Sequence, residues 1–106
     1  MPSLAEMSET CRRLLKDLRQ GPDRHRLLEI ETIIRLLVPH LTRAVADVIH
    51  AGRTEQLGEA RSALLKMRDH LSWVRSNQDA SLPEIQQQLI ESIRCASAVL
   101  GAREHL

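Results

Sequence analysis

Apolar residues recur along most of the chain at the three-to-four-residue spacing of α-helices, and the longest such run spans residues 24–51. At about 100° per residue, its apolar side chains fill an arc roughly 160° wide, which is broader than one neighbouring helix covers. We therefore expect a central helix that contacts two or three partners, within the chain or in a second copy. The apolar positions are Leu27, Ile30, Ile33, Ile34, Leu37, Val38, Leu41, Ala44, Val45, Val48 and Ile49.

Three shorter stretches carry narrower apolar stripes, which predict helices packed on the central one. They span residues 3–20, 54–76 and 82–100. Gly101 follows the last stripe, and a glycine in that position commonly ends a helix. Residues 101–106 are therefore expected to form a frayed tail.

Polar residues mark the predicted helix starts. Ser3 and Glu6 have the spacing of a capping box, in which each side chain reaches the other's free backbone amide. Asp23 follows a Gly-Pro stop and is expected to cap the central helix. Ser81, with Glu84 three residues later, predicts the start of the last helix.

Pro39 lies inside the central stretch, where it removes one backbone hydrogen bond and clashes with the carbonyl of Arg35. The apolar register continues through it without a shift, which favours one kinked helix over two helices with a turn. Short connections favour antiparallel neighbours. The predicted fold class is all-α, an antiparallel four-helix bundle with a long, Pro-kinked central helix 2, formed by a single domain over residues 1–106.

The central helix is also predicted to be longer than its neighbours, at about 40 Å against roughly 27 to 33 Å. Part of its apolar face would then remain uncovered, and a homodimer interface is the natural place to bury it. The residues expected at that interface are Ile30, Ile34, Leu37, Leu41 and Val45.

Composition restricts the function classes. There is no Phe or Tyr and a single Trp, so the core must be aliphatic. The net charge of +1 argues against a chain whose main role is to coat nucleic acid or an acidic membrane. No segment approaches the roughly 20 apolar residues of a membrane span, and two cysteines are too few for a disulfide framework. We expect a cytoplasmic protein.

Trp73 is the strongest candidate for contact with a partner protein, because it lies more than about 100° from the centre of its helix's apolar stripe. Tryptophan often dominates the binding energy at interfaces. The alternative is that its ring folds under the loop 76–80 or against the central helix. Two leucines are also off the apolar stripes. The predicted partner-binding residues are Trp73, Leu65, Leu36, His70 and Lys66.

Two arrangements of basic residues raise the possibility of nucleic-acid binding. A possible basic patch on the first helix comprises Arg12, Arg13, Lys16 and Arg19, but acidic residues are interleaved and no aromatic residue is present to stack a base. A helix-turn-helix around Gly52 would place Arg53, Arg61 and Arg68 near one side of the third helix, which has few base-reading residues at its start. Both patterns favour a solvated surface over a nucleic-acid site.

Metal and catalytic sites are disfavoured. Asp47, His50 and His40 have ligand spacing, but they lie on the polar side of the central helix without a matching pair from another helix. Cys11 belongs to an apolar stripe and Cys95 lies at the edge of one, with no group placed to form a thiolate nucleophile. We predict no enzyme activity, no metal and no cofactor.

The sequence carries no family signature, and it shares only its build with several classes of small bacterial regulator. We predict a non-enzymatic regulatory protein that binds and inhibits or sequesters a partner protein, in the manner of an anti-activator acting on a transcriptional regulator. The alternatives are a secretion-type chaperone, an antitoxin-like inhibitor and a nucleic-acid-binding helical protein.

Overall fold

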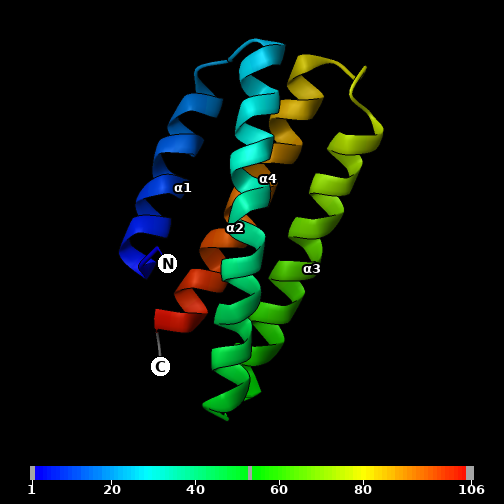
Figure 1. Ribbon diagram of the computed structural model, residues 1–106. Coiled ribbons are helices and arrows are strands. Elements are labelled where there is room, and N and C mark those ends of the chain that lie inside the picture. The colour runs from blue at the N-terminus through cyan, green and yellow to red at the C-terminus, as the bar shows by residue number, and fades with distance from the viewer. Residues whose placement is uncertain (1, 53, 105–106) are drawn as a thin grey trace.

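A computed structural model describes residues 2–52 and 54–104, and within these ranges the chain forms four α-helices and no strand (Figure 1). The prediction of an all-helical bundle is confirmed. The helices are α1 (Leu4–Arg19), α2 (Arg24–His50), α3 (Thr54–Ser76) and α4 (Leu82–Glu104).

The helix boundaries follow from local hydrogen bonds and backbone geometry. The Ser3 hydroxyl accepts the Glu6 backbone N–H at 3.1 Å, and the Asp23 carboxylate accepts a first-turn N–H of α2 at 2.8 Å. Gly21 and Gly52 have φ values of 70° and 69°, a region that residues with a Cβ rarely adopt. These two glycines allow the tight connections that follow α1 and α2.

Both α2 and α4 contact each of the other three helices, and α1 packs more extensively on α4 than on α2. Figure 1 shows the α1–α2 and α3–α4 connections at one end of the bundle and the α2–α3 turn at the other. Side chains tie the helices together by bonding to carbonyls of neighbours. Arg35 of α2 donates to the Leu71 carbonyl of α3 at 2.8 Å, and Gln86 of α4 donates to the Leu18 carbonyl of α1.

The broad apolar face of α2 is buried inside the single chain, because α1, α3 and α4 together cover it. A second copy is therefore not needed to bury that face, and the predicted homodimer interface stays a prediction. None of the five residues assigned to the interface is more than 8% exposed, so a second copy would reach them only if the bundle opened. They are Ile30, Ile34, Leu37, Leu41 and Val45.

Pro39 lies inside α2, which continues as one helix from Arg24 to His50. The uninterrupted apolar register therefore indicated correctly that no turn separates the two halves. The kink at Pro39 stays a prediction.

The end of α4 differs from the sequence-based expectation. The helix continues through Gly101, which does not have a positive φ, and ends at Glu104. The extra turn is held by burial of Ala102 and by Arg103, whose Nε donates to the Asp47 carboxylate of α2 at 3.2 Å. The predicted frayed tail is therefore wrong over residues 101–104, while residues 105–106 lie outside the described ranges.

The four helices differ from membrane spans in length or polarity. None of those in the described ranges has a stretch both long and apolar enough to cross a bilayer.

Candidate functional site

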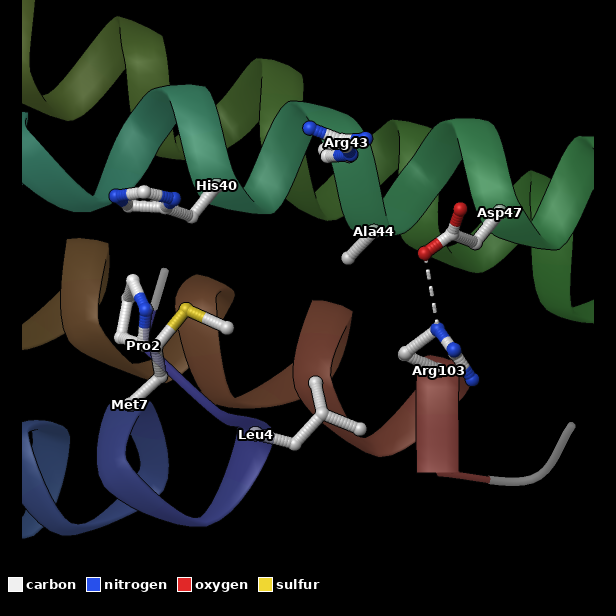
Figure 2. Close-up of a pocket in the computed structure, with 8 residues that line it drawn as sticks. All are labelled: Pro2, Leu4, Met7, His40, Arg43, Ala44, Asp47 and Arg103. Carbon is white, nitrogen blue, oxygen red and sulfur yellow. Dashed lines mark hydrogen bonds and ion pairs between the residues drawn. The ribbon is translucent and has the colours of Figure 1, made fainter.

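A hollow of about 170 Å³ opens where the start of α1 meets α2 and the end of α4 (Figure 2). Apolar side chains from the start of the chain lie on one side, and polar side chains of α2 lie on the other. Its lining residues are Pro2, Leu4, Met7, His40, Arg43, Ala44, Asp47 and Arg103.

The polar side of this hollow is partly neutralised by an ion pair. Asp47 and Arg103 face each other across it, and the dashed line in Figure 2 marks their 3.2 Å contact. Arg43 supplies a second guanidinium and His40 an imidazole. The arrangement suits a small anion better than a cation, because two guanidinium groups outnumber one carboxylate.

The metal-ligand spacing seen in the sequence does not assemble into a metal site. In residues 2–52 and 54–104 no three His, Cys, Asp or Glu side chains converge to hold a metal ion. Asp47 pairs with Arg103, and His50 lies exposed in the last turn of α2.

A second hollow, of about 350 Å³, lies between α3 and α4. It is lined by two residues of the predicted partner-binding set, Lys66 and His70. The His70 imidazole Nδ1 lies 2.6 Å from the side-chain oxygen of Gln88 on α4, so this histidine is engaged within the bundle.

Trp73 is half-buried and packs against the hydrophobic core. It follows His70 by three residues and Lys66 by seven, which places it on the same side of α3 as the hollow between α3 and α4. Its indole therefore contributes to packing within the chain, while a position under the loop 76–80 or against α2 stays a prediction. Its role in contacting a partner stays a prediction.

The other two members of the predicted set are the most exposed large apolar residues described. Leu36 of α2 is 66% exposed and Leu65 of α3 is 60% exposed. Leu36 follows Arg35, which bonds to α3, so it is rotated about 100° away from that contact. That these two leucines and the other three residues bind a partner together stays a prediction.

The predicted basic patch on α1 is also divided. Its four residues are exposed, but Arg12 pairs with Glu9, and Arg13 lines a hollow shared with α2. Arg12 lines a different hollow, formed by α1 alone, together with Lys16 and Arg19.

A row of arginines on α3 is more regular than the patch on α1. Arg61, Arg68 and Arg75 are exposed and seven residues apart, so they lie along one side of the helix. Among the described residues, none of them has an ion-pair partner within 4.0 Å. Arg61 and Arg68 were predicted to share this side with Arg53, which lies outside the described residues. Arg75 was not predicted there, although the seven-residue spacing would have revealed it.

Neither cysteine has the environment of a nucleophile. Burial raises the pKa of the Cys11 thiol above its ordinary value. The pKa of Cys95 is also raised, first by burial and then by the charge of Glu91, against an opposing effect of Lys66. Both thiols therefore stay protonated and unreactive near neutral pH.

Comparisons with known proteins give no relative for this chain. No protein family, no curated protein and no solved structure matches it.

Proposed function

We propose that this protein is a non-enzymatic regulator that binds a transcriptional regulator in the cytoplasm and inhibits or sequesters it through a helical surface. The observation that carries the proposal is the exposure of two leucines on well-formed helices. Leu36 and Leu65 are 66% and 60% exposed, whereas most other large aliphatic residues pack into or against the core.

The physical support is the free energy available on burial of these side chains. Fully burying a leucine side chain contributes about 1.5 to 3 kcal/mol. Leu36 and Leu65 each lie inside a long helix, at least ten residues from either end, so they are held on regular backbone. A partner that covers either one gains apolar contact without ordering a loop, which lowers the entropic cost of association.

The proposal also takes the bundle to be antiparallel, with α2 bent at Pro39. The positions of the connections in Figure 1 support alternating helix directions. The missing N–H of proline and its clash with the preceding turn support the bend. A bend at this position would change the direction of the two halves of α2, and therefore the shape that α2 presents to a partner.

The test is affinity capture from lysate of the source organism. Baits would be the wild-type chain, Leu36→Ser, Leu65→Ser and Trp73→Ala, each checked by circular dichroism for an intact helical fold. We expect one protein to be retained by wild type and lost by at least one leucine variant. Trp73→Ala shows whether the half-buried indole also contributes to binding the captured protein.

Two results would contradict the proposal. Retention of the same proteins by wild type and by a Leu36→Ser/Leu65→Ser double variant would show that the exposed leucines do not bind a partner. Retention of duplex DNA in place of a protein would favour the nucleic-acid alternative.

A further inference from the structure

The surface along which α2 and α3 meet combines exposed apolar side chains with a row of arginines. We propose that this surface docks an acidic amphipathic helix of the partner protein. The inference rests on the proposed function and adds the chemistry of the partner. We call the surface the α2–α3 face, and it comprises Val38, Thr42, Ala46 and Ile49 of α2 with Arg61, Leu65, Arg68 and Arg75 of α3.

The hydrogen bond from Arg35 to the Leu71 carbonyl identifies the side of α2 that borders α3. Steps of three or four residues from Arg35 keep to this side of the helix and lead to Val38, Thr42, Ala46 and Ile49. The α2–α3 turn joins the two helices at one end (Figure 1). Along the helix axis, Thr42 lies about 10 Å beyond Arg35 in the direction of that turn. Leu65 lies about 9 Å beyond Leu71 in the same direction, so Thr42 and Leu65 are at about the same height in the bundle.

The apolar part of the face has its most exposed members on both helices. Leu65 is 60% and Ile49 is 44% exposed, and Val38 and Ala46 are half-buried. Such a shallow apolar strip between two helices suits the apolar side of a third helix, whose anchors repeat every three or four residues.

The arginines flank this strip. Arg61 precedes Leu65 by four residues and Arg68 follows it by three, so both are its direct neighbours on the helix surface. Arg75 continues the row. Among the described residues these three arginines have no ion-pair partner, a property that they share with Arg13, Arg19, Arg24 and Arg43.

Acidic residues are scarce on the same face. The stretch 32–46 of α2 contains no Asp or Glu, and Glu31 just before it is bound by Arg35. Glu59 of α3 lines the hollows on the α4 side. Asp69, four residues after Leu65, is the carboxylate nearest to the row along α3. The face therefore carries a net positive charge.

This combination favours a peptide carboxylate over a nucleic-acid phosphate. Guanidinium groups bind carboxylates and phosphates alike with two parallel hydrogen bonds, so the choice between them rests on the apolar residues of the face. Leu65 and Ile49 would find no apolar counterpart along a phosphate backbone, and no aromatic side chain of the face is available to stack a base. An acidic helix with an apolar side matches both the charge and the apolar strip.

The test uses a synthetic, fluorescently labelled amphipathic peptide of about five helical turns, with leucines at helical spacing and glutamates on both flanks. Binding to the full chain is measured by fluorescence anisotropy at low and high salt. We expect the glutamate peptide to bind, and a lysine version of the same peptide to bind at least about tenfold more weakly. Absence of binding by the glutamate peptide at low salt would overturn the inference.

Charge reversal locates the site. Arg61→Glu/Arg68→Glu should weaken binding of the glutamate peptide by about tenfold or more, and Leu65→Ser should weaken it even at high salt. The matched control is Lys16→Glu/Arg19→Glu on α1, which changes the net charge equally at two exposed positions. The affinity of this control variant for the glutamate peptide should fall by less than about threefold. Equal losses of affinity in the two double variants would show that net charge alone is responsible and would overturn the inference.

Other occupants of the face give different results. If a second copy of the chain covers it, light scattering shows a dimer that Leu65→Ser converts to a monomer. If nucleic acid binds it, a short DNA duplex competes with the peptide and loses affinity in Arg61→Glu/Arg68→Glu. Either result would overturn the acidic-helix assignment.

The proposed function can survive failure of this inference. A captured partner that is lost by Leu36→Ser but retained by Arg61→Glu/Arg68→Glu would leave a partner-binding regulator whose docking surface lies on the outer side of α2. If every one of these variants retains the same partner as wild type, the acidic-helix inference and the proposed function are both contradicted.

Discussion

Replacement of Gly101 by alanine should stabilise the protein, because α4 continues through this position. Gly101 has no positive φ, and a Cβ added there would meet no atom within 4 Å apart from its own helix backbone and immediate neighbours. Glycine in a helix interior costs about 0.5 to 1 kcal/mol relative to alanine. Since Gly101 is in the last turn of α4, we expect about 0.5 kcal/mol, or an increase in Tm of about 2 °C.

Gly58 of α3 provides a second site with the same properties, since a Cβ there also meets nothing within 4 Å. The Gly58→Ala/Gly101→Ala double variant should gain about 1 to 1.5 kcal/mol and about 4 to 6 °C in Tm. Gly21→Ala is the control of opposite sign, because its φ of 70° costs a residue with a Cβ about 1 kcal/mol.

Thermal unfolding followed by far-UV circular dichroism measures all these variants under one condition. A Gly101→Ala variant that lowers Tm as Gly21→Ala does would refute the continuation of α4 through this position. That result would mean that Gly101 adopts a left-handed C-cap and that α4 ends there, as the sequence alone indicated.

Other predictions concern the core and the thiols. Ile34→Ala should destabilise the chain by about 2 to 4 kcal/mol in urea unfolding, whereas Leu36→Ala should change stability by less than about 0.5 kcal/mol; equal effects would contradict the assignment of Ile34 to the core. Because the folded-state pKa of Cys11 is raised, the folded state binds more protons than the unfolded state once the pH exceeds the ordinary thiol pKa of 9.0. The free energy of unfolding should therefore fall above that pH, and it should fall less in Cys11→Ala. Iodoacetamide should modify Cys95 faster than Cys11, because Cys11 is buried, as peptide mass spectrometry at mildly alkaline pH can test.

Local signals in the sequence were sufficient to predict where helices form, but not which helices pack against one another. The cap at Ser3 depends on residues within one turn, so it was readable and is present. The end of α4 depends on Arg103 reaching Asp47 on α2, a contact between residues far apart in the sequence. A glycine without a following proline was too weak a stop signal to outweigh burial of Ala102.

The same limit applies to surfaces. The width of the α2 apolar arc predicted two or three neighbours, but it did not distinguish a second copy from α1, α3 and α4. Ile34, which was predicted at a dimer interface, is fully buried within the single chain. Leu36 and Leu65 were correctly placed off the apolar stripes, because each helix wheel alone determines that. The positions of Leu65 and Ile49 along the boundary between α2 and α3 depend on how the two helices pack, which a wheel does not contain.

The central claim is that the chain inhibits a transcriptional regulator by binding it, and a mobility-shift titration tests it most directly. The captured regulator is bound to its own promoter DNA, and the chain is added up to and beyond an equal molar amount. We predict that the wild-type chain removes the protein–DNA complex and that Leu36→Ser/Leu65→Ser leaves it intact. A complex that persists with the wild-type chain, or a shift of the DNA by the chain alone, would contradict the account.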